Sequence, residues 1–246
     1  MRTVSVTRYV TPLREGGSLP GLVEADDEGL YVLKFSAAGH GVLALVAELV
    51  SGEIARTLGL PVPELVLARL DAELARTEPD PEIHALIHDS AGLNLALDFL
   101  PGSVNFDPLV HALTPALASR IVWLDGFVSN VDRTARNTNM LMWHRTPWLI
   151  DHGSSLYFHH ADGWQNEPAR ATAPFPAIRD HVLLRLASQI REEDAALAAA
   201  LTPAAIDAVL DRVPEEWAID VAPYRRYFLE RLAAPRAFVE EAAGAR

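Results

Sequence analysis

Three short strand-like segments open the chain, and a helix-like segment follows them with almost no linker. The strands are predicted at residues 4–12, 19–25 and 30–36, where apolar and β-branched residues alternate with turn sequences. Apolar residues then recur at helical spacing over residues 42–58, and a glycine and a proline end that pattern. Because short turns join neighbouring strands, this order predicts an antiparallel meander with one helix packed beside it.

Two more strands complete the first half of the chain. They are predicted at residues 64–70 and 93–100, and a short helix is possible in the polar, proline-containing segment between them. The last strand ends at Pro101-Gly102, a pair of residues that interrupts regular structure. Residues 1–102 are therefore predicted to form a lobe built on an antiparallel β-sheet with one helix.

The second half of the chain is mainly helical in pattern. An apolar-faced helix is predicted at residues 115–129, a hairpin from strands at residues 140–144 and 148–150, and three or four helices over residues 177–243. Residues 103–246 are therefore predicted to form a helical C-lobe. The fold class expected for the whole chain is α+β with two lobes.

Composition restricts the class of protein. The formal net charge is −12 and there is no Lys/Arg-rich run, whereas proteins that bind nucleic acid directly carry a basic patch. No apolar stretch has the length of a membrane span, the N-terminus lacks the apolar centre of a signal peptide, and there is no cysteine for a disulfide or a thiolate metal site. We therefore expect a cytoplasmic protein that contacts neither membranes nor nucleic acid directly.

Two carboxylates and an amide have the order and spacing of a phosphoryl-transfer site. Asp132 and Asn137 are five residues apart on a predicted loop after a helix, and Asp151 follows at the end of the hairpin. Phosphoryl transfer from ATP needs one carboxylate to orient the attacking hydroxyl, and an amide oxygen and a second carboxylate to hold Mg²⁺ across the phosphates. We predict Asp132 as the catalytic residue and Asn137 and Asp151 as metal ligands.

Each part of this pattern is common when it occurs alone. Asp and Asn are frequent in loops because they cap turns. The preceding helix, the D-x-x-x-x-N offset, the intervening hairpin and the second Asp together match the order that protein kinases use. The conjunction therefore favours a kinase site over an ordinary loop.

A lysine in the first half of the chain is a separate test of this interpretation. Kinases place a lysine on the third strand, where it contacts the ATP phosphates and a glutamate of the next helix. Lys34 lies on the third predicted strand, and the following helix carries Glu48 and Glu53. On a helical wheel Glu48 shares its face with small residues, whereas Glu53 lies near Arg56 and is expected to be solvated. We predict that Lys34 and Glu48 belong to the catalytic set.

The remaining nucleotide contacts are predicted from glycines and from the end of the fifth strand. Gly16, Gly17 and Ser18 form a turn between the first two strands, where a kinase covers the phosphates; residues 37–41 are a second candidate because they precede a helix N-terminus. Phe99 and Leu100 are predicted to contact adenine as hinge residues between the lobes.

The chain resembles the HipA-like kinases, a bacterial family related to the phosphatidylinositol and protein kinases. The resemblance rests on the pattern N-x-D-R-x-x-x-N at residues 130–137, on Ile-Asp-His-Gly at residues 150–153, and on the helix end at residues 58–64. It implies a bilobal protein-kinase-like fold, ATP and Mg²⁺ as cofactors, and a serine/threonine kinase activity. It does not identify the acceptor.

Two departures leave alternatives open. Thr134 stands where the family often has a histidine, and His152 stands where related kinases have phenylalanine. The substituted histidine position leaves a nucleotide-binding module without catalysis as one alternative. The acidic composition, which would suit a cationic acceptor, leaves a small-molecule kinase as another. The spacing of His152, His159 and His160 does not place three metal ligands on one regular element, and we interpret them as part of a loop in the position of an activation segment.

Overall fold

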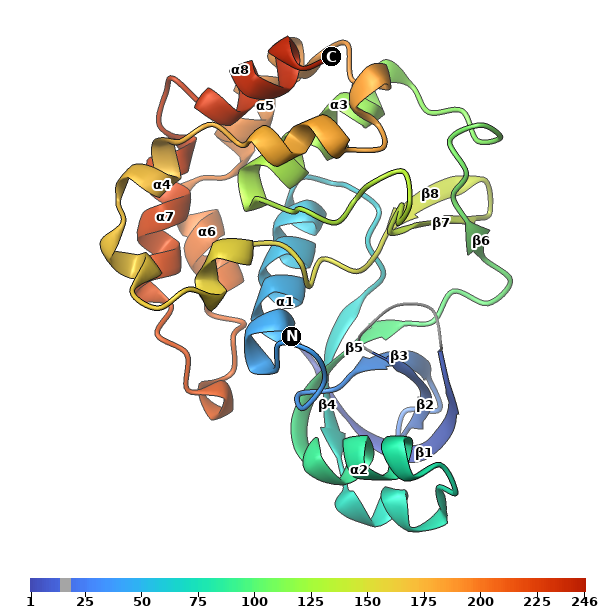
Figure 1. Cartoon of the computed structure of the whole chain (residues 1–246). Coiled ribbons are helices and arrows are strands. Elements are labelled where there is room, and N and C mark those ends of the chain that lie inside the picture. The colour runs from blue at the N-terminus through green and yellow to red at the C-terminus, as the bar shows by residue number, and fades with distance from the viewer. Residues whose placement is uncertain (14–18) are drawn as a thin grey trace.

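The computed structural model describes residues 1–13 and 19–246. Within them, five strands form a closed barrel in the order β1-β2-β3-β5-β4, seen at the lower right of Figure 1. The strands are β1 (Thr3–Pro12), β2 (Gly21–Ala25), β3 (Leu30–Lys34), β4 (Leu65–Leu70) and β5 (Gly92–Asp98). Four pairings are antiparallel, but β1 and β4 pair in parallel, with Thr3 opposite Leu67. The prediction of a purely antiparallel sheet is wrong for the β1–β4 pair, because hairpin sequence patterns do not show whether strands far apart in the chain pair with each other.

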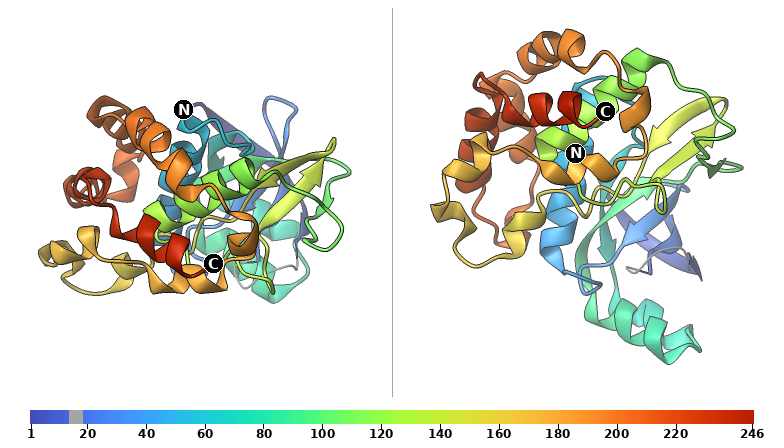
Figure 2. Two further views of the ribbon diagram at one scale, coloured as in Figure 1. Left: turned by 90° about the horizontal axis from the view of Figure 1, so that it is seen from above. Right: turned by 45° about the horizontal axis from the view of Figure 1, so that its top comes forward.

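Alternating side chains fill the barrel. Val4 and Val6 of β1 are buried while their neighbours are exposed, as the two-residue period of a strand requires. Helix α2 (Pro81–Asp89), preceded by the 3₁₀ helix η1 (Ala72–Thr77), adds Ile83 and Ile87 to this core. Figure 2 shows α2 on the side of the barrel away from the helical half. The described part of the N-terminal half therefore contains two α-helices, where one was expected with a second as a possibility.

Helix α1 (Val42–Thr57) lies between the barrel and the C-terminal helices and contacts both (Figure 1). The predicted small-residue face is where it approaches the sheet: a Cβ atom on Gly52 would lie 3.2 Å from the Leu65 side chain of β4. The prediction that Glu53 is solvated is wrong. Glu53 is only 4% exposed and forms an ion pair with Arg212, because α6 (Pro203–Leu210) covers that face of the helix.

The second half of the chain is built around α3 (Pro115–Val128). Its Trp123 and Phe127 rings contact Phe238. A small sheet lies to one side, made in order of β6 (Val104–Asn105), β7 (Met140–Trp143) and β8 (Thr146–Leu149). The other elements are η2 (Tyr157–His160), η3 (Trp164–Asn166), α4 (Ala169–Thr172), η4 (Pro176–Asp180), η5 (Leu184–Leu186), α5 (Ile190–Ala200), α6 (Pro203–Leu210), η6 (Glu215–Trp217), α7 (Ala222–Leu232) and α8 (Ala237–Gly244). The hairpin turns at His144 and Arg145, both with positive φ, one residue earlier than expected.

The apolar core does not divide near residue 102, where the sequence changes from mainly strands to mainly helices. One cluster fills the barrel, and a larger one joins α1, Leu65 and Leu97 to the C-terminal helices. Helix α1 thus belongs to the first half in sequence and to the second half in packing, while the boundary near residue 102 stays a prediction. Among the described residues, no helix is both long and apolar enough to cross a membrane.

Candidate active site

A cavity of about 290 Å³ between the barrel and the helical half is lined by the residues predicted to form the catalytic and metal site. Five predicted residues line it: Lys34, Glu48, Asp132, Asn137 and Asp151. They come from β3, from α1, from the loop after α3 and from the segment after β8. Residues up to 117 positions apart in the chain therefore meet at one site.

Lys34 is the link between the two halves of this site. Its Nζ lies 2.5 Å from Asp151 Oδ1 and 3.5 Å from Glu48 Oε2. Burial by itself would lower the pKa of the Lys34 ammonium, but the two carboxylates outweigh burial and raise it. Lys34 is thus held as a cation between a carboxylate of α1 and one that follows β8.

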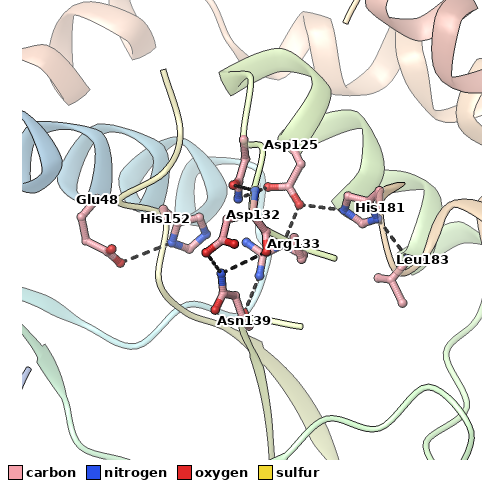
Figure 3. A network of polar contacts seen from close by, with 9 residues as sticks. Glu48, Asp125, Asp132, Arg133, Asn139, His152, His181 and Leu183 are labelled. Carbon is pink, nitrogen blue, oxygen red and sulfur yellow. Dashed lines mark hydrogen bonds and ion pairs between the residues drawn. The ribbon is translucent and has the colours of Figure 1, made fainter. Parts of the chain in front are cut away.

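Glu48, rather than Glu53, is the glutamate that faces Lys34. Its side chain is fully buried, and Oε1 lies 3.5 Å from Nδ1 of the equally buried His152, as Figure 3 shows. Burial would raise the pKa of Glu48, but the charge of Lys34 and the contact with His152 lower it to about 2. His152 therefore packs where the resemblance leads us to expect a phenylalanine, and supports the carboxylate that holds Lys34.

Asp132 is held by two amides. Asn137 Nδ2 donates to Asp132 Oδ2 at 2.8 Å, and Asn139 Nδ2 donates to the same oxygen at 3.1 Å. No described residue donates to Oδ1. Asn137 is exposed in the cavity, whereas Asn139 is buried at the start of β7 and was not predicted.

A buried ion-pair network holds this loop from behind (Figure 3). Arg133 Nε donates to Asp125 Oδ2 at 2.6 Å, and His181 Nε2 lies 2.8 Å from the same oxygen. The Leu183 N–H donates to His181 Nδ1 at 3.0 Å, so Nε2 is the nitrogen that carries the proton toward Asp125. Burial would raise the pKa of Asp125, but Arg133 and His181 outweigh burial and lower it strongly.

Sequence reasoning missed Asp125 and His181. They are 56 residues apart, and Asp125 lies inside a mostly apolar helix, so no local spacing connects them. His181 also forms a β-bridge with Thr134, the residue that stands where the family often has a histidine. A histidine from a distant segment therefore lies beside that position.

Asp151 has a backbone conformation suited to few residues. Its φ is +56°, in the left-handed region that Asp and Asn tolerate better than most residues. The chain turns there directly after β8, and the carboxylate reaches both the cavity and Lys34. The turn thus places the predicted metal ligand where the hairpin ends.

A second cavity, of about 570 Å³, adjoins the first through Lys34 and Asp151. The predicted hinge residues Phe99 and Leu100 line it together with apolar side chains, including Leu97. Among the described residues, the backbone N–H of Leu100 has no acceptor. The predicted contacts Gly16, Gly17 and Ser18 lie outside the described residues.

The alternative phosphate loop, residues 37–41, reaches the first cavity. Ala38, Gly39 and His40 line it, and Gly39 has a φ of +53°. Within the described chain, the N–H groups of Gly39 and His40 donate to no acceptor. Free amides before the start of α1 can bind phosphate oxygens.

The histidines after Asp151 are structural. Among the described residues, no group of three His, Asp or Glu side chains lies close enough to hold a metal. His159 Nδ1 lies 3.0 Å from the Tyr224 hydroxyl, and burial, followed by the neighbouring His160 and His40, lowers the pKa of His159 to about 3. This imidazole therefore stays neutral in the folded chain well below its ordinary titration range.

We expect His159 to make the fold acid-sensitive. Because its pKa is lower folded than unfolded, only the unfolded chain takes up the proton as the pH falls below about 6.5, and the free energy of unfolding drops by about 2 kcal/mol at pH 5. His159→Gln keeps a group that can bond Tyr224 but does not titrate, so the loss should shrink. Urea unfolding from pH 7 to 5 measures this. The exposed His84→Gln is the control, and equal pH slopes in all three proteins would refute the assignment.

The fold is that of a kinase. The crystal structure of the Helicobacter pylori proinflammatory kinase CtkA superimposes with a TM-score of 0.57, at 15% identity, over 92% of this chain and 93% of that one. The Golgi casein kinase superimposes with a TM-score of 0.57, at 10% identity, over 99% of this chain and 74% of that one. No curated protein sequence matches the chain.

The family follows from the sequence match. A family model described as HipA-like kinase matches residues 6–228, so the chain belongs to the HipA-like kinase family. The expected resemblance is confirmed, and the protein is a kinase-type phosphotransferase.

Proposed function

We propose that the protein uses ATP and Mg²⁺ and transfers the γ-phosphoryl group to a serine or threonine hydroxyl of a protein acceptor. The observation that carries this proposal is that Lys34, Glu48, Asp132, Asn137 and Asp151 line one cavity. That cavity joins a larger one with apolar walls. Phosphoryl transfer depends mainly on positioning and charge stabilisation, which such a set of residues can supply.

The two cavities suit the two ends of the nucleotide. Adenine fits the larger cavity, where the Leu100 N–H, which has no acceptor among the described residues, can donate to a ring nitrogen and Leu97 offers an apolar wall. Lys34 stands at the junction, so its ammonium reaches the phosphates. The N–H groups of Gly39 and His40, which donate to no other described residue, can bind phosphate oxygens from the other side.

The residues present fit a magnesium ion. Asn137 and Asp151 offer an amide oxygen and a carboxylate in the same cavity, and Mg²⁺ is commonly bound by one or two carboxylates together with substrate phosphates and water. The bound ion would neutralise the charge that develops on the transferred group. Lys34 forms an ion pair with Asp151 in this structure. When nucleotide binds, the Lys34 ammonium would contact both Asp151 and the phosphates.

We expect Asp132 to position the acceptor. Its Oδ2 is occupied by two amide donors, which leaves Oδ1 for the proton of the incoming hydroxyl. As the hydroxyl oxygen bonds to the γ-phosphorus, that proton passes to Oδ1, and the bond from the γ-phosphorus to the bridging oxygen breaks to release ADP.

Nucleotide binding tests the metal assignment without needing an acceptor. A non-hydrolysable ATP analogue with Mg²⁺ should raise the thermal unfolding midpoint, and EDTA should remove most of that increase. Asn137→Ala should need at least about tenfold more Mg²⁺ for the same increase, since one ligand is gone. Asn166→Ala, an exposed residue of η3, is the matched control. An Asn137→Ala titration identical to wild type would remove Asn137 from the site.

A further inference from the structure

A third cavity, of about 420 Å³, lies in the helical half beside the proposed catalytic loop. Its walls include Ser129, Tyr157, Phe158, Arg170, Phe175 and Arg231. The mechanism proposed above uses none of these residues. The cavity is formed where the segment after Asp151 folds against the end of α3 and against α7.

This cavity is close to the first cavity, the one lined by Lys34, Asp132 and Asp151, which is called the phosphate cavity below. Ser129 is three residues before Asp132, and Tyr157 is three residues after Ser154, which lines the phosphate cavity. Three residues reach at most about 11 Å even when fully extended. Two independent segments therefore set an upper limit on the distance between the walls of the two cavities. An extended acceptor of a few residues could occupy both.

Arg231 gives this cavity an unbalanced positive charge. Its side chain is only 3% exposed, and it donates to the backbone carbonyls of Gly126, Ala171 and Ala173, with no carboxylate partner among the described residues. Buried charges are normally paired with an opposite charge. Burial also lowers the pKa of Arg231, in keeping with the lack of an acidic partner.

Arg170 adds a second cation. It pairs with Glu167 and stacks over the Phe158 ring, with 5.2 Å from Cζ to the ring centroid. Its Nε is buried without an acceptor among the described residues. The cavity walls therefore carry two arginines against one glutamate, in a protein whose net charge is −12.

We propose that this cavity binds an anionic side chain of the acceptor polypeptide, a carboxylate or a phosphorylated residue, a few residues from the hydroxyl that is phosphorylated. The inference rests on the proposed function and adds the acceptor class. Arg170 supplies the accessible cation, and Tyr157 and Phe175 supply walls against which the peptide can pack.

Peptides that differ in one residue test the proposal. Each holds one serine in an alanine background, with Glu, phosphoserine, Ala or Lys placed in turn at the neighbouring positions. At one or two positions, Glu or phosphoserine should raise kcat/KM about tenfold over Ala, the size of one charged hydrogen bond. The Glu and phosphoserine sets show which anion is preferred.

Arg170→Glu is the decisive variant, because it reverses the charge at the partly exposed arginine and leaves buried Arg231 in place. It should abolish the preference for Glu and favour Lys at the same position, with Arg170→Ala between the two. Arg185→Glu makes the same charge change at an exposed residue outside the cavity and should behave as wild type. Equal rates for all peptides, or an unchanged preference in Arg170→Glu, would overturn the proposal.

A binding measurement separates this proposal from the catalytic one. Fluorescence anisotropy of a labelled serine-free peptide that contains Glu should give a Kd about tenfold below that of its Ala counterpart, and Arg170→Glu should remove the difference. Equal affinities with intact autophosphorylation would reject the anion site alone. A clear affinity difference in a protein that never transfers phosphate would reject the proposed function alone.

Discussion

Asp132→Asn should abolish phosphoryl transfer while leaving nucleotide binding in place. The substitution keeps the size of the side chain and can still accept from Asn137 and Asn139 through its oxygen. It removes the group that takes the hydroxyl proton, and general-base catalysis contributes roughly 10²–10⁴-fold. We expect autophosphorylation, followed by intact-mass spectrometry, to slow by about 10³-fold. The thermal shift with the ATP analogue and Mg²⁺ should change little.

The control for this variant is Asp162→Asn. Asp162 is exposed in the segment after Asp151 and lines neither proposed nucleotide cavity. It should transfer phosphate as wild type does. If Asp132→Asn and wild type label at the same rate, Asp132 is not the residue that handles the acceptor hydroxyl. If wild type binds nucleotide but transfers nothing, the chain is a nucleotide-binding module instead.

The second large effect is expected on stability, from Asp125→Asn. This change leaves Arg133, which is 1% exposed, as a buried cation without its carboxylate. Removing one partner of a buried ion pair costs about 3–5 kcal/mol. Urea unfolding at pH 7 should show that loss. Phosphoryl transfer should fall as well in the fraction that stays folded, because Arg133 is next to Asp132 and also donates to the Asn139 carbonyl.

A surface ion pair of the same type is the matched control. Asp207 pairs with Arg225, and both side chains are more than two-fifths exposed. Asp207→Asn should cost no more than about 1 kcal/mol, because water solvates the arginine that remains. If Asp125→Asn and Asp207→Asn lowered the free energy of unfolding by similar amounts, burial would not be what makes the Asp125–Arg133 pair stabilising.

Local patterns were enough to place most elements. The strand periods and the turn glycines predicted each barrel strand to within a few residues, and the helix over residues 42–58 became α1. Glu48 faces Lys34, and its role in catalysis stays a prediction; the small residues on the Glu48 face mark the side of the helix that packs on the sheet. The same helical wheel wrongly predicted that Glu53 is solvated. An isolated helix would expose that face, but in the folded chain α6 covers it.

Long-range contacts were beyond such patterns. The parallel β1–β4 pairing joins strands separated by α1, and the partner of Asp125 at His181 is 56 residues away. Asn139 donates to the same Asp132 oxygen as Asn137, but it is buried, and its burial depends on where β7 begins. In each case the deciding term is the packing of distant segments, which residue spacing does not encode.

Residue order was sufficient for the chemical inventory: one lysine, one glutamate, two aspartates and one asparagine in the order a kinase uses, since catalytic groups must keep their residue type and their place on local elements. Folding was needed to bring them into one cavity, to bury Asp125 with Arg133 and His181, and to leave Arg231 buried with no carboxylate partner in the described part of the chain. The physical reason is that charge pairing and desolvation depend on which segments meet in space, and that is set by the shared core around α1 and α3.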